Sequence, residues 1–177
     1  DYVEFGCQRF LTFQMAWRAV QSQPIERKLW AYSSFDRIAA AQTARDLHPR
    51  WLPGTPLLST AAFTQRCRWA GIGSQQRELV KLDPDGSSDP PPIPDRLAFV
   101  FVSFQSFTEV RAVLRWLTPR LSNGVILAFE HYHCGTRFDC SGARNAFLDL
   151  KESRPDLAFE PYRPFGLAGL SFVVVDA

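Results

Sequence analysis

The chain has 177 residues, of which 46% are hydrophobic and 21% charged, and its formal net charge is +2 at pH 7. This length and composition are typical of a globular protein that buries a core without the help of disulfides or metal ions, so we expect one domain spanning residues 1–177. The small net charge gives no reason to expect nucleic acid or a membrane surface as a partner. The longest apolar runs are also far shorter than the roughly 18 residues that a membrane-spanning helix needs.

Cysteine usage indicates the compartment. The four cysteines do not suggest a disulfide framework, and we expect a reduced, cytoplasmic setting. We expect no signal peptide before the first strand. The chain opens almost directly on a strand and without Met, so we expect that a segment before Asp1 has been lost or removed. Cys7 has no histidine nearby in sequence and is interpreted as a small buried core residue rather than a nucleophile.

The first half of the chain alternates predicted strands and helices. In chain order, the patterns predict a strand at 2–5, a helix with apolar residues recurring from Phe10 to Val20, a strand at 29–32, a helix at 36–45, a loop at 47–58, a helix from its N-cap Ser59 to Gly71, and a strand at 78–82. Residues 83–95 contain five prolines and two serines, which favour a Pro-rich surface loop over a domain boundary.

The second half gives the clearer pattern. Two continuous apolar runs, 97–102 and 125–129, are separated by a helix with one apolar face over 107–121, as in a βαβ unit of a buried parallel sheet. A helix around Phe147 and two final strands, at 159–162 and 171–175, follow. We therefore predict an α/β fold with a doubly wound, mostly parallel seven-stranded sheet, whose last strand is antiparallel.

Polar residues follow both apolar strands of the second half. They are Ser103 and Gln105 after the first, and Glu130 and His131 after the second. In an open α/β sheet ligands bind outside the carboxyl ends of the strands, so these side chains are candidates to hold a substrate or a metal. His131 suits a general base, since the ordinary pKa of histidine lies near neutral pH. The alternative is that Glu130 and His131 merely solvate a strand end.

A glycine follows the first predicted strand. Gly6 permits a tight turn that brings the next helix N-terminus towards a ligand, although a simple βα turn explains it equally well. The G-x-G-x-x-G fingerprint is absent, which disfavours an enzyme using NAD or a nucleotide sugar.

His131, His133, Cys134 and Cys140 are close in sequence, and these residue types are the ligands that zinc prefers. Adjacent His133 and Cys134 cannot easily both bind one ion, and the spacing matches no common finger. An ordinary loop with buried thiols is the favoured interpretation.

Taken in order, these segments resemble the class I S-adenosylmethionine (SAM)-dependent methyltransferases, particularly the macrocin-type sugar O-methyltransferases. The resemblance covers nearly the whole chain, although each motif is of modest specificity. The matching segments are Tyr-Val-Glu-Phe-Gly at 2–6, Ala-Tyr-Ser-Ser-Phe-Asp at 31–36, Trp-Leu-Pro-Gly at 51–54 with the helix 59–71, the strand and helix 99–117, the strand 124–132, and the start of the next helix at 141–147.

The resemblance implies a cofactor site after the first two strands. Glu4, Gly6, Thr12 and Asp36 would lie on the cofactor side. The chain departs from the family here: Phe10 replaces the second glycine of the SAM loop, where we expect it to crowd the cofactor. The acidic residue that would bind the ribose falls on a serine, Ser33.

The departures are larger on the acceptor side. Where the family has an Asp-x-Asp pair, this chain has Ser103 and Gln105, and where it has Asp-Asp it has Glu130 and His131. In the family those carboxylates bind magnesium, which lowers the pKa of the hydroxyl to be methylated. Magnesium prefers several hard oxygen ligands, so we expect no tight metal site here. His131 and Glu130 would then be the catalytic residues.

The resemblance therefore suggests an O-methyltransferase that uses SAM and acts on a sugar or another hydroxylated secondary metabolite. The alternative is a methyltransferase-like domain that has lost its catalytic groups and serves as an interaction or scaffolding module. The expected partners are a small-molecule acceptor and, in a homo-oligomer, further copies of the chain.

Overall fold

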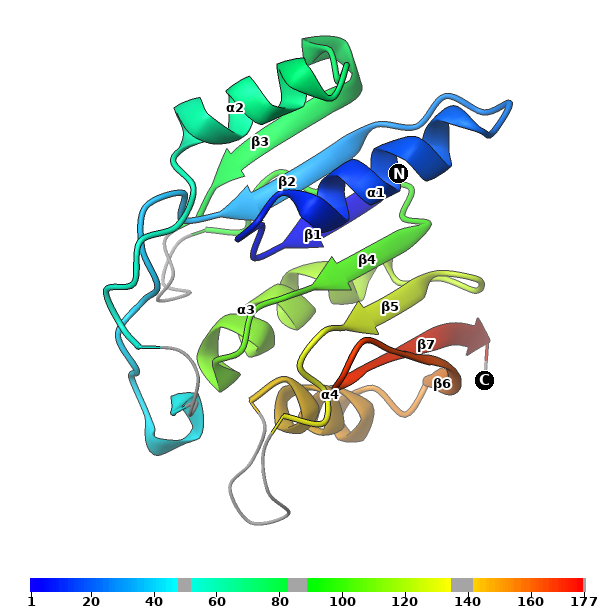
Figure 1. Cartoon of the computed structure of the whole chain (residues 1–177). Helices are drawn as coiled ribbons and strands as arrows, with labels where there is room; N and C mark the ends of the chain where they lie inside the picture. Colours follow the sequence, from blue (N-terminus) through cyan, green and yellow to red (C-terminus); the bar gives the residue numbers. More distant parts are fainter. Residues whose placement is uncertain (48–51, 83–88, 135–141, 177) are drawn as a thin grey trace.

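The computed structural model describes residues 1–47, 52–82, 89–134 and 142–176. Its seven-stranded sheet extends from β3 at the top of the view to β6 at the bottom (Figure 1). The spatial order of the strands is β3-β2-β1-β4-β5-β7-β6. Their bounds are β1 Tyr2–Phe5, β2 Leu29–Ser33, β3 Arg77–Lys81, β4 Phe99–Val102, β5 Ile126–Phe129, β6 Leu157–Phe165 and β7 Gly169–Asp176.

The sheet confirms the predicted topology. Strands β1 to β5 pair in parallel, and β7 runs antiparallel to both of its neighbours, β5 and β6. β1, β4 and β5 lie side by side near the centre. The last strand, β7, is inserted between β5 and β6, so that β6 forms the edge of the sheet.

Helices cover both faces of the sheet (Figure 1). The α-helices are α1 Leu11–Gln21, α2 Thr60–Trp69, α3 Phe107–Leu117 and α4 Gly142–Ser153, and short 3₁₀ helices span η1 Ala44–Asp46, η2 Ser74–Gln76 and η3 Thr118–Arg120. None of the helices in the described ranges has both the length and the apolar character required to cross a membrane.

Alternation along β1 divides the core in two. Val3 and Phe5 belong to a cluster with buried residues of α3 and α4, whereas Tyr2 lies in a cluster with buried residues of α1 and α2. Successive side chains of a strand point to opposite faces, so the central strands are buried on both sides. Continuous apolar runs are therefore required there, and the sequence has them.

Local signals in the sequence set the helix ends. Ser59 accepts a hydrogen bond from the backbone of Ala62 and caps α2, as predicted, and Ser106 caps α3 in the same way through Glu109. Gly71 adopts φ 73° just after α2, the left-handed conformation that ends many helices.

The helix predicted at 36–45 is wrong. Phe35 has φ 51°, which turns the chain out of a helical path immediately after β2. The backbone of Ile38 then pairs with that of Thr55 and Gly54, and Arg37 forms an isolated bridge with Pro56. Only η1, at 44–46, is helical. The predicted loops fit the structure where it describes them: residues 89–95 contain no helix or strand, and 48–51 and 83–88 lie outside the described residues.

The edge strand β6 is irregular. It carries Pro161 and Pro164, and its register with β7 shifts between these two residues. The hairpin that follows places the ring of Phe165 over the Cα of its pairing partner Gly169, where an added Cβ would lie 2.5 Å from the ring. Glycine is thus required at position 169 by the aromatic ring across the hairpin.

Candidate active site

The four polar residues expected at the ends of β4 and β5 come together. Ser103 and Glu130 each extend the parallel ladder by one step, since the amide of Ser103 donates to Phe5 at 2.8 Å and that of Glu130 donates to Val102 at 3.0 Å. The hydroxyl of Ser103 donates a short hydrogen bond to Glu130 Oε2. Ser103 is 5% exposed, whereas the Glu130 side chain is 43% exposed. The carboxylate is therefore accessible to solvent, although the hydroxyl that donates to it is buried.

His131 joins this pair through its Nε2 atom. Nε2 lies 3.2 Å from Gln105 Nε2 and 3.7 Å from Glu130 Oε2, and the ring is 15% exposed. When the ring carries its hydrogen on Nδ1, the amide nitrogen of Gln105 donates and Nε2 accepts. The ring is thus held by groups from two strands, and a hydroxyl that took the place of Gln105 would meet a proton acceptor.

The opposite ring nitrogen contacts Cys134, which the sequence grouped with His131 only in the zinc interpretation. Cys134 Sγ lies 3.5 Å from His131 Nδ1. The spacing His-x-x-Cys could have indicated this contact, because a turn brings the ends of four residues together, and the amide of Cys134 donates to the carbonyl of His131 at 3.2 Å.

This arrangement does not fit magnesium. Among the described residues, Glu130 supplies the one carboxylate beside His131, and it already accepts from Ser103. The other groups are a hydroxyl, an amide and an imidazole, a poor match for a cation that prefers an octahedron of oxygens. Among the described residues no group of three or more histidine, cysteine or acidic side chains could hold a metal ion. Cys140, part of the zinc interpretation, lies outside them.

Glu4, expected on the cofactor side, is buried beneath α1. Its carboxylate accepts from Tyr2 Oη at 2.7 Å and from Thr12 Oγ1 at 2.6 Å, and the residue is 1% exposed. Burial raises the pKa of Glu4 to about 7, and the nearby negative charge of Glu130 adds to the effect, while the two hydrogen bonds oppose it. Glu4 and Thr12 therefore fix the start of α1 relative to β1.

Gly6 lies close to the backbone of the residues after β4. It has φ 87°, and a Cβ added there would lie 2.9 Å from the backbone nitrogen of Phe104. Its amide donates to Tyr32 at 2.8 Å, which sets it beside the end of β2. Glycine is thus needed for the packing of β1 against the residues after β4. A larger residue would disturb this packing before it filled any cofactor space.

Asp36, the remaining residue of the expected cofactor side, is at the surface. Its side chain is 61% exposed and pairs with Arg37 at 3.1 Å. Ser33, at the position that is acidic in the resembling family, is fully buried and accepts from the amide of Phe35 at 3.4 Å. Asp36 is therefore the acidic side chain after β2 that solvent can reach.

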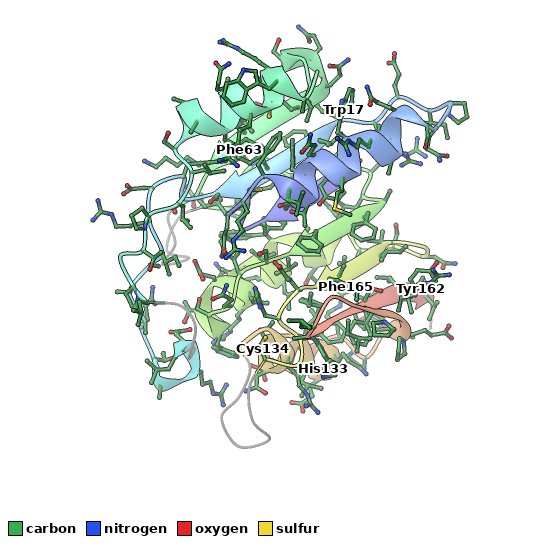
Figure 2. The ribbon with its side chains drawn as sticks, in the orientation of Figure 1. Trp17, Phe63, His133, Cys134, Tyr162 and Phe165 are labelled. Atoms are coloured by element: carbon green, nitrogen blue, oxygen red, sulfur yellow. The ribbon has the colours of Figure 1, made fainter. Side chains whose placement is uncertain are left out.

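The turns after β1 and β2 share an aromatic anchor. Phe10 and Phe35 both have positive φ, 67° and 51°, and both rings pack edge-on against Phe63 of α2, at 5.1 and 5.5 Å between centroids. Figure 2 shows Phe63 between α2 and the sheet. Phe10 is 5% exposed, so its ring is part of the core, and the crowding of a cofactor by this residue stays a prediction.

Comparison with known proteins gives a consistent answer for the fold. No protein-family model matches the sequence, and no curated protein matches it. Among solved structures, the O-methyltransferase NovP superposes with a TM-score of 0.74 at 21% identity, covering 98% of this chain and 71% of that protein. CalS11 is a calicheamicin methyltransferase, also described as a TDP-rhamnose 3'-O-methyltransferase. It superposes with a TM-score of 0.68 at 16% identity, covering 97% of this chain and 71% of that protein.

A third structure was determined with the cofactor. It is TomG from Streptomyces achromogenes, an O-methyltransferase involved in tomaymycin synthesis, in complex with SAM. It superposes with a TM-score of 0.60 at 14% identity, covering 99% of this chain and 73% of that protein. At these identities the likeness establishes architecture. The chain has the Rossmann-like fold found in these O-methyltransferases.

Proposed function

We propose that this chain is a SAM-dependent O-methyltransferase whose acceptor is a hydroxylated small molecule, such as a sugar or another natural product. The observation that carries the proposal is the grouping of His131, Glu130, Ser103 and Gln105 at the carboxyl end of the sheet, one strand away from the Gly6 turn. NovP, CalS11 and TomG, which share the fold, are O-methyltransferases.

Within this proposal the backbone of the first turn fits a cofactor. Gly6 and Phe10 both adopt left-handed conformations, and α1 begins at Leu11 with no side chain capping its first amides. When bound, SAM supplies an electrophilic methyl group on a sulfonium. Asp36 is the exposed carboxylate after β2 and would accept hydrogen bonds from the ribose hydroxyls.

The acceptor would lie against His131. Nε2 would take the proton of the acceptor hydroxyl as its oxygen bonds to the methyl group that SAM would supply. Glu130, 3.7 Å from the same nitrogen, stabilises the imidazolium that results. Most of the acceleration comes from alignment of the hydroxyl with the methyl group, which the fixed side chains after β4 and β5 provide.

Cofactor binding is tested first, by calorimetric titration with SAM and with its demethylated product. We expect both to bind, and we expect Asp36→Ala to weaken binding by about tenfold, the loss of one or two hydrogen bonds. Asp149→Ala, an exposed carboxylate on α4, is the matched control and should bind like the wild type. Failure of the wild-type protein to bind either compound at millimolar concentration would favour the alternative of an interaction module.

Acceptor chemistry is tested by incubation of the protein and SAM with a panel of sugars and phenolic glycosides, with release of the demethylated cofactor as the signal. His131→Asn should abolish this release, whereas His133→Asn should leave it unchanged. His133 is the matched control because its exposed side chain lies on the same loop. Equal activity of the two variants would remove His131 from the mechanism.

A further inference from the structure

The loop after β5 brings a thiol to the imidazole from the side opposite to Gln105. Cys134 Sγ is 3.5 Å from His131 Nδ1, while His131 Nε2 is 3.2 Å from Gln105 Nε2 and 3.7 Å from Glu130 Oε2. Figure 2 shows Cys134 beside His133 on the segment that leads from β5 towards α4. The order is thus thiol, imidazole, carboxylate.

This order is the one that activates cysteine nucleophiles. A base within reach of the sulfur takes the proton, and a third group on the far nitrogen orients the ring and stabilises its charged form. In the other tautomer, with its hydrogen on Nε2, the same ring can accept from the thiol at Nδ1. Nε2–H then faces Glu130, with the Gln105 amide turned so that its oxygen accepts. The resulting imidazolium would lie between a thiolate and a carboxylate, an arrangement favoured by both charges.

The other described cysteines provide a contrast within the same chain. Cys7 and Cys67 are 1% and 0% exposed and lie in the apolar cluster under α1 and α2. Burial raises the pKa of Cys67 to about 11, and it raises that of Cys7 far above the usual range. Both therefore remain protonated at neutral pH. Cys134 is partly exposed and has a base as its neighbour.

We propose that Cys134 is a nucleophilic thiol, ionised through His131, that is modified by soft electrophiles such as haloacetamides and α,β-unsaturated carbonyl compounds. With iodoacetamide, the thiol proton moves to His131 Nδ1 and the sulfur forms a bond to the methylene carbon. The carbon–iodine bond breaks and iodide leaves with its electron pair. The imidazolium then returns its proton to solvent.

Modification of Cys134 has a consequence for the reaction proposed above, and this consequence depends on that proposal. The thiol and the acceptor hydroxyl use the same imidazole, one at Nδ1 and the other at Nε2. An alkyl group on Cys134 would lie against the ring of His131 and would change its position. Alkylation should therefore inhibit methyl transfer, while the reactivity of the thiol itself needs neither SAM nor acceptor.

The test is competitive labelling of the full chain with limiting iodoacetamide at pH 7, with N-acetylcysteine in the same solution as an unperturbed thiol. Mass spectrometry of the peptides follows each cysteine separately. We expect Cys134 to react at least about tenfold faster than the reference thiol. Cys7 and Cys67 should remain unlabelled, and their labelling in any variant would report loss of folding.

Two variants assign the cause. His131→Asn should lower the labelling rate of Cys134 by about tenfold or more, and Glu130→Gln should lower it by a smaller factor, while His133→Asn should not change it. A Cys134 that reacts no faster than the reference thiol, or at the same rate in His131→Asn, overturns the inference. Failure of the proposed function shows separately, as a reactive thiol in a protein that binds no SAM.

Discussion

The hydroxyl of Tyr2 donates a 2.7 Å hydrogen bond to the carboxylate of Glu4, two residues further along the same strand and on the same face of the sheet. A carboxyl group so placed, under α1 and 1% exposed, is easier to bury protonated than ionised. Burial raises the pKa of Glu4 from the ordinary 4.5 to about 7. The stability of the protein should therefore depend on pH in a defined direction.

We expect the free energy of unfolding to fall as the pH rises from 5 to 8. Below pH 4.5 the carboxyl of Glu4 is protonated in both states, and the stabilising difference is fully present. Between 4.5 and about 7 the unfolded chain releases this proton and the folded one keeps it, so the difference is lost, about 3 kcal/mol in all. Urea denaturation at several pH values measures this slope.

The variant Glu4→Gln should remove about half of the slope. Part of it should remain, because burial also raises the pKa of Glu109 to about 7. The double variant with Glu109→Gln should then be nearly flat between pH 5 and 8. An unchanged slope in both variants would mean that neither carboxyl is protonated in the folded protein near neutral pH.

At position 10 we expect a glycine variant to be more stable than an alanine variant, the reverse of the usual order in a helix. Phe10→Ala removes the ring from Phe13 and Phe63 but keeps a Cβ in a left-handed backbone, whereas Phe10→Gly also relieves about 1 kcal/mol of backbone strain. We expect the glycine variant to be the more stable of the two in thermal unfolding. At Phe13, inside α1, the usual order should hold, and Phe13→Ala should be more stable to thermal unfolding than Phe13→Gly. The same order at both positions would contradict the strain at residue 10.

Asp46 should be a strong structural anchor. Its carboxylate accepts from Thr108 through both the amide, at 2.7 Å, and the hydroxyl, at 2.9 Å, and from the amide of Thr43 at 2.8 Å. These bonds tie the segment after β2 to the first turn of α3 and lower the pKa of Asp46 against the effect of its burial. Asp46→Asn should cost about 1–3 kcal/mol in urea denaturation.

The matched control for that variant is Asp149→Asn. Asp149 is half-exposed and lies 3.9 Å from Arg45, a surface pair that should contribute less than about 1 kcal/mol. Equal losses in the two variants would show that the bonds of Asp46 do not hold the segment.

Methyl transfer should persist in excess chelator. Within the part of the chain that the structure describes, the groups near His131 offer one carboxylate, so we expect no step to need a divalent cation. We expect His131→Ala to lower kcat by about 10²–10⁴-fold, and the wild-type rate to rise through the pH range in which an imidazole loses its proton. Chelator-sensitive activity that tolerates His131→Ala would assign the role to a metal instead.

Much of the fold followed from patterns of local sequence. Continuous apolar runs such as 97–102 occur where a strand is buried on both faces, and Ser59 and Gly71 carry the chemistry of helix ends. The topology of a parallel sheet then places the residues after β4 and β5 at one edge. For this reason Ser103 and Glu130 could be predicted as neighbours although 27 residues separate them.

Other features depend on contacts that no local pattern records. The helix expected at 36–45 is absent because Phe35 gains more by packing on Phe63 than its backbone loses in a left-handed conformation. The resemblance predicted Glu4 on the cofactor side. It could not predict how deeply Glu4 is buried or that its carboxylate accepts from Tyr2 and Thr12, because these features depend on how α1 packs against β1.

The irregular edge of the sheet has a consequence for self-association. An edge strand exposes a row of backbone donors and acceptors that can recruit a strand from another molecule. In β6 the residues Pro161 and Pro164 have no N–H to offer, and the register shift between them interrupts the even spacing that an incoming strand would need. This edge of the sheet is therefore protected against the growth of cross-strand aggregates, and copies of the protein that assemble would have to meet through other surfaces.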